Sequence, residues 1–382
     1  MSEYRRQDVR RAREINGDPA ALGIDRAVGE MRRGRAIHIA GRSTSGAPAG
    51  LVTAAAETAQ APLVRRLEFT GRRLIVLLTE ERAHSIGIAG NARGPVAVAL
   101  PPGAQIEYLR ALAGASPGQP DLRLASVEHA PRCGPLAAAG FKLAKAGRLL
   151  PALVAIESDA PPDASLLSLD VDDIESQARF ARHSLKQIGQ SRVPLADAVH
   201  CELALFRDEH RLGEHVAVII GEPNLAEPVP VRLHSACLTG DLLGSLRCDC
   251  GEQLRTAVRR IAELGGGVLL YLDQEGRGIG LANKLRAYAL QDDGLDTIDA
   301  DRHLGFLADE RNYDVAAAVL QALGVSRVRL LTNNPQKIAA LAAHGIHVAG
   351  RLPLVGRTNS HNERYLRAKR ERAGHLADES EA

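Results

Sequence analysis

Three closely spaced cysteines are the residues of this sequence best suited to chemistry. Cys237, Cys248 and Cys250 lie within fourteen residues, although the chain of 382 residues has only five cysteines. Thiolates are soft ligands that suit zinc, and a Cys-x10-Cys-x-Cys set supplies three of the four ligands of a tetrahedral ion. Because no fourth ligand follows at C-x2-C spacing, we predict an open zinc site whose ion activates water.

Two structural interpretations compete with this zinc site. Buried free cysteines often act as small apolar packing residues, and a disulfide is possible in principle. Cys248 and Cys250 flank a single residue, which suits two ligands of one ion better than a disulfide. We interpret Cys133 and Cys201, which lie in ordinary apolar surroundings, as packing residues.

A glycine-rich turn is the second candidate. The apolar run Val268–Leu272 predicts a buried strand, and the segment Asp273–Gly280 that follows it has three glycines and Arg277. Backbone N–H groups in such a turn bind phosphate oxygens, and an arginine clamps them with two hydrogen bonds. An ordinary glycine turn with a surface ion pair explains the same pattern.

Asp309 and Arg311 form the third candidate. Residues two apart share a face in extended structure, where they form an ion pair. A surface ion pair is the simpler interpretation. If both side chains face the zinc site, Asp309 is instead a candidate general base.

The segment Thr332–Lys337 is the fourth candidate, because it follows a predicted strand at Val328–Leu331 and opens a predicted helix at Ile338–Ala343. A hydroxyl, two amides and a lysine at a strand-to-helix turn bind an anion or the edge of a purine. The same sequence is also a good helix cap, which is the commoner reason for it.

The order of the predicted helices and strands that position these residues indicates an α/β protein of two domains, each a mixed sheet with flanking helices. The predicted organisation is a flexible arm (1–23), a first domain (24–157), a linker (158–191), a second domain (192–375) and a disordered tail (376–382). Periodicity predicts helices at Ile24–Arg33, Glu80–Ser85 and Leu254–Leu264, a helical connector at Asp172–Gln187, and strands at Ala36–Ile39 and Arg73–Leu78.

Composition excludes several classes of function. A net charge of +2 gives no general attraction to nucleic acid, and 3% aromatic residues with no tryptophan leave little for base stacking. No apolar run approaches the ~20 residues that span a bilayer, so no membrane partner is expected. The start lacks a signal-peptide core, and free thiols fit a reducing compartment, so we expect a cytoplasmic protein.

As a set, these stretches resemble the GTP cyclohydrolase II family, which opens the guanine ring of GTP in the first step of riboflavin biosynthesis. The similarity covers about residues 200–375. It rests on blocks in the family's order: His234–Asp241, Ser245–Gly251, Gln274–Arg277, Asn283–Asp292, Gly305–Arg311 and Leu330–Pro335.

The resemblance implies that Cys237, Cys248 and Cys250 bind one Zn²⁺, whose activated water attacks C8 of guanine. Formate and diphosphate leave, and the product is 2,5-diamino-6-ribosylamino-4(3H)-pyrimidinone 5′-phosphate. By the same resemblance Asp309 is the proton acceptor and Arg311 acts at the α-phosphate. Tyr288 lies near the ring that opens. The implied GTP contacts are Arg232, His234, Ser235, Gln253, Glu275, Gly276, Arg277, Thr297, Thr332 and Lys337.

Elementary chemistry agrees with these roles. A triphosphate requires cations, here Arg277, Arg311 and Lys337 together with Mg²⁺. Guanine recognition requires a carboxylate that accepts from N1–H and the exocyclic amine, and Glu275 is a candidate for it. The family also implies a homodimer.

Three positions depart from the family pattern. Ala236 replaces a usual glutamate, Asp273 a usual basic residue, and Gly278 a usual asparagine. The loss of a carboxylate and a cation near a triphosphate weakens GTP binding or marks a changed substrate. Two alternatives therefore stand beside the main hypothesis: a paralogue that acts on another nucleotide, as in pyrimidine catabolism, and a zinc-containing regulatory module without turnover.

The N-terminal domain is more weakly similar to 3,4-dihydroxy-2-butanone-4-phosphate synthase, through Arg26–Arg35, Leu51–Ala55, Leu78–Arg82 and Leu149–Val154. The acidic loop of that family, which binds magnesium, is replaced by Gly41–Gly50, and its Gly-His-Thr-Glu motif falls on Pro135–Ala138. Since no carboxylate remains in that loop to bind a hard cation, we predict an inactive relic kept for dimerisation or stability.

Overall fold

The computed structural model describes residues 19–372, apart from residues 92, 117, 125, 130, 181–184, 209–212, 355, 357, 364–366 and 368–370. The predicted tail (376–382) and residues 1–18 of the predicted arm lie outside the described residues. The chain forms two compact units. The first runs to Phe180 and also contains Asp301–Ala308, and the second contains the rest.

The first unit has a seven-stranded sheet of order β5-β4-β3-β6-β2-β1-β7, in which only the β1–β7 pair is parallel. Its strands are β1 (Ile37–Arg42), β2 (Pro48–Ala55), β3 (Ile75–Leu78), β4 (Val96–Ala99), β5 (Ser126–His129), β6 (Ala152–Glu157) and β7 (Ser168–Asp170). Its helices are α2 (Pro19–Arg32), α3 (Ala61–Glu68), α4 (Glu80–Ser85), α5 (Ile106–Ala113), η1 (Leu122–Leu124), α6 (Gly134–Ala146) and α7 (Val171–Phe180).

Helices cover both faces of this sheet, because alternate strand residues point to opposite sides. In β3, Ile75 and Leu77 pack with α2 and α6, whereas Val76 and Leu78 pack with α3 and α5. A strand that is buried on both faces is apolar at successive positions, which explains the run Ile75–Leu78.

The second unit has a seven-stranded mixed sheet of order β14-β13-β11-β12-β10-β9-β8. Its strands are β8 (Leu185–Arg192), β9 (Cys201–Asp208), β10 (Glu214–Gly221), β11 (Val229–Ser235), β12 (Gly266–Leu272), β13 (Arg327–Leu331) and β14 (His347–Leu352). Its helices are η2 (Leu238–Leu242), α8 (Cys250–Glu263), η3 (Glu275–Gly278), α9 (Leu281–Asp292), α10 (Thr297–His303), α11 (Asp314–Ala322) and α12 (Pro335–Ala343). The last turn of α10 belongs to the first unit.

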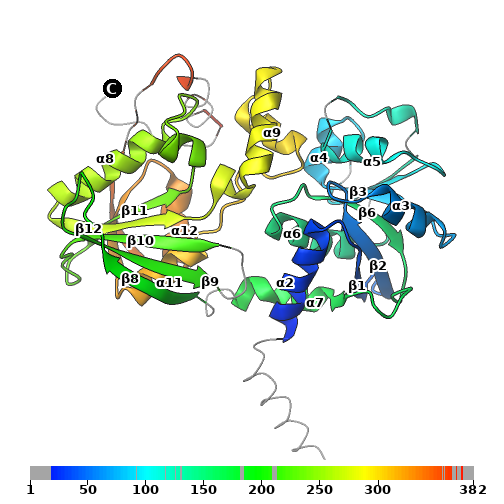
Figure 1. Ribbon diagram of the computed structural model, residues 1–382, viewed down its shortest axis with the longest axis horizontal. Coiled ribbons are helices and arrows are strands. Elements are labelled where there is room, and N and C mark those ends of the chain that lie inside the picture. Colours follow the sequence, from blue (N-terminus) through cyan, green and yellow to red (C-terminus); the bar gives the residue numbers. More distant parts are fainter. Residues whose placement is uncertain are drawn as a thin grey trace, which may run out of the picture. The chain divides into compact units, whose positions relative to one another are not determined.

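The topology of the second unit brings the candidate residues to one edge. Strands β12, β11 and β13 are parallel neighbours, so their carboxyl ends lie side by side. One apolar cluster joins α8 to one face of the sheet, and another joins α11 and α12 to the opposite face (Figure 1). The loops that follow the carboxyl ends of parallel strands are the usual place for a ligand in such a sheet.

These two mixed sheets with flanking helices confirm the predicted α/β class. Most predicted elements are present, with shifted ends: α2 begins at Pro19, inside the predicted arm, and proline suits the first turn of a helix. The predicted linker 158–191 contains β7, α7 and most of β8. The prediction of a helical connector at Asp172–Gln187 is confirmed as far as Phe180, where α7 ends, and is wrong from Leu185, where β8 begins to pair antiparallel with β9. Tertiary strand pairing overrides local preference here. Among the described residues, no helix is both long and apolar enough to cross a bilayer.

Candidate functional site

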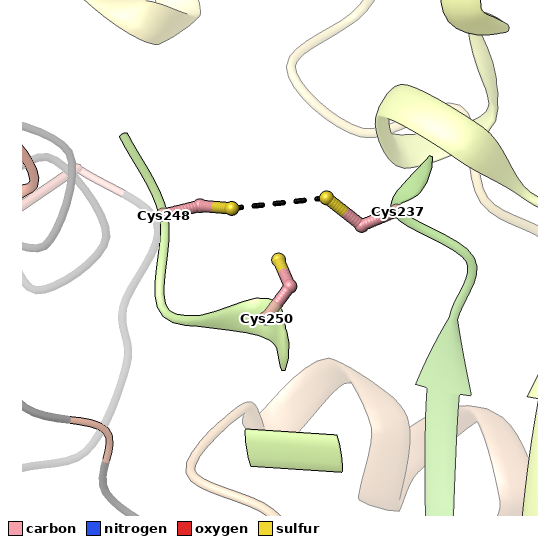
Figure 2. A group of neighbouring side chains, drawn as sticks. All are labelled: Cys237, Cys248 and Cys250. Atoms are coloured by element: carbon pink, nitrogen blue, oxygen red, sulfur yellow. Dashed lines mark hydrogen bonds between the residues drawn. The ribbon is translucent and has the colours of Figure 1, made fainter. Parts of the chain in front are cut away.

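The three cysteines converge beyond the carboxyl end of β11. Cys237 follows that strand, Cys248 lies in the loop after η2, and Cys250 is the first residue of α8 (Figure 2). Their sulfur atoms all lie within 4.8 Å of one another, and the sulfurs of Cys237 and Cys248 are 3.7 Å apart. Within the described part of the chain, no fourth cysteine, histidine or carboxylate belongs to this group.

The donor set fits zinc. Three sulfurs at this separation suit one soft or borderline cation, and a helix N-terminus at Cys250 favours negative charge on the ligands. The loop is tightly packed around them, because a Cβ added at Gly240 would lie 2.8 Å from the sulfur of Cys248 and 3.1 Å from that of Cys237. The backbone N–H of Gly240 also donates to Cys237 Sγ at 3.3 Å.

The surroundings shift the pKa values of two of the thiols in opposite directions. Contacts from Cys248, Cys250 and Lys284 lower the pKa of Cys237, whereas the adjacent Cys237 sulfur raises the pKa of Cys248. A bound dication lowers the pKa of every coordinating thiol and removes this competition. Cys133 and Cys201 do not join the group, and Cys201 Sγ donates to the Val193 carbonyl at 2.7 Å.

A buried lysine that the sequence did not single out connects the cysteines to the glycine turn. Lys284 Nζ, on α9, lies 3.1 Å from Cys237 Sγ, 2.9 Å from Thr239 Oγ1 and 2.7 Å from Glu275 Oε1. The side chains of Lys284 and Glu275 are 10% and 8% exposed. Burial opposes the charge of Lys284, but Glu275 and Cys237 outweigh it and raise its pKa.

Glu275 therefore holds in place the segment that carries the three cysteines, residues 237–250, which we call the metal loop. Its second oxygen accepts from the backbone N–H of Leu238 at 2.6 Å, and Oε1 also accepts from Gly276 N at 3.2 Å. A carboxylate has about four lone-pair directions, and these contacts use three of them. One direction remains, whereas the predicted contact with N1–H and the exocyclic amine of guanine needs two, so Glu275 would have to exchange one of its present donors for the base.

Asp241 is a second residue that the sequence did not single out. Its carboxylate lies 3.1 Å from His234 Nε2 and accepts from Cys237 N at 2.9 Å and from Tyr271 OH at 3.1 Å. Burial lowers the pKa of His234, even though the Asp241 carboxylate favours its protonated form. This network fixes the start of the metal loop against β11 and β12.

The Asp309–Arg311 pair is a two-bond pair, as the extended spacing predicts. Arg311 Nε and Nη2 donate to the two oxygens of Asp309 at 2.8 and 2.5 Å, and the Arg311 backbone N–H adds a bond of 3.0 Å. Burial opposes ionisation of Asp309, but these contacts with Arg311 outweigh it and lower the pKa of Asp309. Arg277 contributes further positive charge to Asp309.

Arg277 has an unusual backbone. Its φ is +61°, next to Gly276 at +62°, and a non-glycine residue in this region is uncommon. Its carbonyl accepts from Glu310 N at 3.1 Å, and its side chain lies 3.4 Å from the Thr297 carbonyl. The turn thus links the predicted contact Thr297 to the Asp309 segment.

The remaining predicted contacts lie on the parallel strands and the turns after them. Arg232 donates to Gln253 Oε1 at 2.6 Å and to the Leu331 carbonyl at 2.9 Å, and Lys337 donates to the Leu233 carbonyl at 2.7 Å. Thr332 accepts from Asn334 N at 3.0 Å. Arg232 interacts electrostatically with Cys250 and with Arg311.

Three buried polar atoms on β11 have no hydrogen-bond partner among the described residues. They are Arg232 Nε, His234 Nδ1 and Ser235 Oγ. Buried polar groups are nearly always bonded, so unpartnered ones at one sheet edge indicate a ligand that would bond them.

Two tyrosine rings each lie close to two cations. The guanidinium of Arg247 and the ammonium of Lys284 lie 5.0 and 5.7 Å from the centre of the Tyr288 ring. Tyr313 lies 5.6 Å from Arg311 and 5.9 Å from Lys337 in the same manner. Tyr313 was not predicted, because a tyrosine after Arg311 gives no local signal.

Two of the three departures from the family pattern have a structural setting. Gly278 has φ +97°, and a Cβ there would lie 2.9 Å from the Glu310 carbonyl carbon, so the Asp309 segment packs directly on this glycine. The backbone N–H of Asp273 donates to His215 Nδ1, on β10, at 3.1 Å. Nothing in the structure explains Ala236.

In the first unit, the loop between β1 and β2 meets the start of α6. Thr44 N donates to the Arg132 carbonyl at 3.1 Å, so the two segments predicted as remnants of a synthase site lie together. The segment Pro135–Ala138 lies in the first turns of α6. No group of three potential metal ligands is found among the described residues of this unit.

Comparisons with known proteins agree on the family. The sequence model of GTP cyclohydrolase II matches residues 186–353. A protein of Azospirillum brasilense named GTP cyclohydrolase-2 is 42% identical over 370 residues, which cover 94% of this chain and 95% of that protein. The GTP cyclohydrolase-2 of Shewanella amazonensis is 50% identical over 196 residues, 51% of this chain and 95% of the relative. The riboflavin biosynthesis protein RibBA of Parabacteroides distasonis is 51% identical over 177 residues, 46% of this chain and 44% of the relative.

Proposed function

The chain belongs to the GTP cyclohydrolase II family of enzymes, and from this premise we propose that it is zinc-dependent and acts in riboflavin biosynthesis. The proposed reaction converts GTP to 2,5-diamino-6-ribosylamino-4(3H)-pyrimidinone 5′-phosphate, with release of formate and diphosphate. The observation that supports it most is the group of three cysteine sulfurs within 4.8 Å, without a fourth protein ligand among the described residues.

Cys237, Cys248 and Cys250 are the residues that would hold the zinc ion. An ion with three protein ligands supplies Lewis-acid activation of water near neutral pH. The neighbouring residues keep the ligands in place: Lys284 donates to Cys237, and Asp241 accepts from the Cys237 backbone N–H. Such outer contacts orient metal ligands and tune their basicity.

Asp309 is the proposed proton acceptor. Its lowered pKa keeps it ionised at neutral pH, and a general base must be ionised before it takes a proton. Arg311 holds both of its oxygens, so the carboxylate has a fixed orientation. In the same position the Arg311 guanidinium is the proposed contact of the α-phosphate, where diphosphate leaves.

The other proposed contacts divide by chemistry. Arg277 and Lys337, with Mg²⁺, are the proposed partners of the phosphates, since three negatively charged groups require cations. Glu275 and Tyr288 are proposed at the guanine ring, beside the metal ligands. His234, Ser235 and Arg232 contribute the unpartnered polar atoms that a bound nucleotide would satisfy.

For the first unit we propose that the synthase reaction is absent. The loop Gly41–Gly50 has no carboxylate, and magnesium prefers carboxylate and carbonyl oxygens. Ribulose 5-phosphate is the test substrate. Formation of the butanone phosphate would refute this part of the proposal.

The experiment for the main proposal compares the wild type with Cys248→Ser and Cys201→Ser. Cys201 is a matched control, because it is a buried thiol outside the metal group. With GTP, Mg²⁺ and zinc, we expect formate and the diaminopyrimidine product from the wild type and from Cys201→Ser, and neither product from Cys248→Ser.

A panel of other nucleotides separates the alternatives. The departures at Ala236 and Asp273 favour a changed substrate as the second candidate. Formate from another nucleotide but not from GTP would support that paralogue. Zinc bound by four protein ligands with no turnover of any nucleotide would support the regulatory module.

A further inference from the structure

An aspartate separates two of the proposed zinc ligands. Asp249 lies between Cys248 and Cys250 in the metal loop, and it is the N-cap residue of α8. Asp249 followed by Glu252 three residues later is the usual sequence pattern of a capped helix start. The structure does not form this cap, because the Asp249 side chain makes no capping hydrogen bond. The helix therefore lacks the stabilisation that an aspartate normally gives at this position.

The Asp249 carboxylate instead accepts from a glutamine in the first turns of α8. Gln253 Nε2 donates to Asp249 Oδ2 at 2.5 Å, and Arg232 Nη2 donates to Gln253 Oε1 at 2.6 Å. Because a guanidinium only donates and a carboxylate only accepts, the amide has one orientation, with its oxygen toward Arg232 and its nitrogen toward Asp249. Both ends of the Gln253 amide are thus bonded within the protein.

The position of Arg232 on β11 explains why it meets Gln253. In the parallel ladder Arg232 pairs with Leu269 of β12, which belongs to the apolar cluster on the α8 face. The neighbours Val231 and Leu233 belong to the cluster on the opposite face. Since side chains alternate along a strand, the Arg232 side chain lies on the α8 face, where Gln253 bonds it.

The Arg232 guanidinium is buried, and the acceptors that it bonds are neutral. Arg232 is 6% exposed, and its bonded acceptors among the described residues are the Gln253 amide oxygen and the Leu331 carbonyl, 2.9 Å from Nη1. Burial lowers the pKa of Arg232, and the Asp249 carboxylate is the strongest of the influences that oppose this shift. A buried cation is costly unless it is bonded and balanced. Arg232 therefore depends on Gln253 for a hydrogen bond and on Asp249 for opposite charge.

These hydrogen bonds connect three parts of the candidate site within the second unit. Asp249 belongs to the metal loop, Arg232 belongs to β11, and Leu331 ends β13 immediately before Thr332, a predicted nucleotide contact. With both terminal nitrogens of Arg232 bonded, the plane of the guanidinium is fixed. Arg232 Nε has no partner among the described residues, and it is the atom that a bound nucleotide would satisfy.

We propose that Asp249 and Gln253 are positioning residues for Arg232, which orient its guanidinium for the nucleotide and connect it to the metal loop. This inference rests on the proposed function, in which Arg232 binds the nucleotide. It gives Gln253 a role different from the direct contact that the family resemblance implies. It also gives a role to Asp249, which the sequence did not single out.

The first test compares Gln253→Leu, which removes both amide bonds, with Gln321→Leu. Gln321 is a matched control, because its amide also bonds within the second unit, to the His344 carbonyl at 3.0 Å. We expect KM for GTP to rise about 10-fold in Gln253→Leu, with kcat within about threefold, because a hydrogen bond to a charged group is lost. Gln321→Leu should keep the wild-type KM.

A double-variant cycle separates positioning from direct contact. If Gln253 acts through Arg232, adding Gln253→Leu to Arg232→Met should raise KM by less than about twofold, because the residue to be positioned is already absent. Increases in KM that multiply would mean that Gln253 itself binds GTP, and they would overturn the inference.

A glycine pair tests the Asp249 end of the connection. A Cβ added at Gly356 would lie 2.6 Å from Asp249 Cβ and 3.1 Å from Asp249 Oδ2, whereas a Cβ added at Gly350 has nothing within 4 Å. Gly356→Ala should therefore displace the Asp249 carboxylate and raise KM for GTP, and Gly350→Ala should not. Equal KM values in these two variants would overturn the role of Asp249.

Amide hydrogen exchange of the zinc-loaded protein without GTP tests the positioning independently of catalysis. Peptides covering residues 229–235 and 331–337 should exchange faster in Gln253→Leu than in Gln321→Leu. A residue that only contacts GTP would leave this exchange unchanged, and that result would overturn the inference. Absence of formate from the wild type would refute the proposed function, and the exchange comparison would still decide whether Gln253 holds Arg232.

Discussion

The buried Lys284–Glu275 pair gives the sharpest quantitative prediction. Lys284→Met removes the ammonium and keeps most of the side-chain volume. The Glu275 carboxylate then loses a partner at 2.7 Å, in a place where both side chains are about one-tenth exposed. Breaking a buried pair by removing one partner costs about 3–5 kcal/mol, because the other charge stays buried.

The contacts that remain place this variant at the low end of that range. Glu275 keeps the backbone donors Leu238 N and Gly276 N. We therefore expect a loss of about 3 kcal/mol in the free energy of unfolding of the second unit, which lowers Tm by about 6–12 °C for a unit of this size.

The assay is differential scanning calorimetry of the full chain with excess zinc. Arg260→Gln is the control, because Arg260 and Glu263 form an ion pair in the same unit but are both more than half exposed. Such exposed pairs contribute about 0–1 kcal/mol. If Lys284→Met melts within about 2 °C of this control, the pair does not stabilise the metal loop and our reasoning about it is wrong.

Three further predictions concern other parts of the structure. Gly278→Ala should destabilise the second unit and lower kcat for GTP, because its Cβ would lie 2.9 Å from the Glu310 carbonyl group; Gly294→Ala, with φ +105° and open space, is the control for both measurements. Tyr313→Phe should keep most activity, whereas Tyr313→Leu should raise KM for GTP about 10-fold, since cation–π contacts with Arg311 and Lys337 require the ring; equal KM values in the two variants would contradict this. Burial, followed by the charge of Arg82, lowers the pKa of His303 from 6.5 to about 4, so the folded protein binds this proton less readily than the unfolded chain. The contribution of neutral His303 to the free energy of unfolding is therefore complete above pH 6.5 and is lost as the pH falls toward 4. In urea denaturation at a series of pH values, His303→Gln should make the free energy of unfolding less dependent on pH between 6.5 and 4. The control His361→Gln, at an exposed histidine, should not.

What the sequence predicted well depends on residues that are close along the chain. Cys237, Cys248 and Cys250 come together through one loop and one helix start, so their spacing carries most of the geometry. The Asp309–Arg311 contact is equally local. The turns after Leu272 and Leu331 were found because buried parallel strands have clear apolar runs.

What the sequence did not predict depends on contacts between distant segments. Lys284 is 47 residues from Cys237, and a lysine in a helix normally indicates a solvated face. The strand β8 has mostly polar, exposed residues and forms because β9 offers a partner. In the same way, no local pattern shows that Asp301–Ala308 packs with the first unit, since its partner Thr79 is 226 residues from Gly305.

A zinc titration of the apoprotein, with formate release from GTP as the readout, tests the central claim most directly. We predict that activity rises linearly and stops rising at one zinc per chain, with three thiols protected from modification at that point. Formate release without zinc would contradict it, and so would one bound zinc per chain with no formate from GTP.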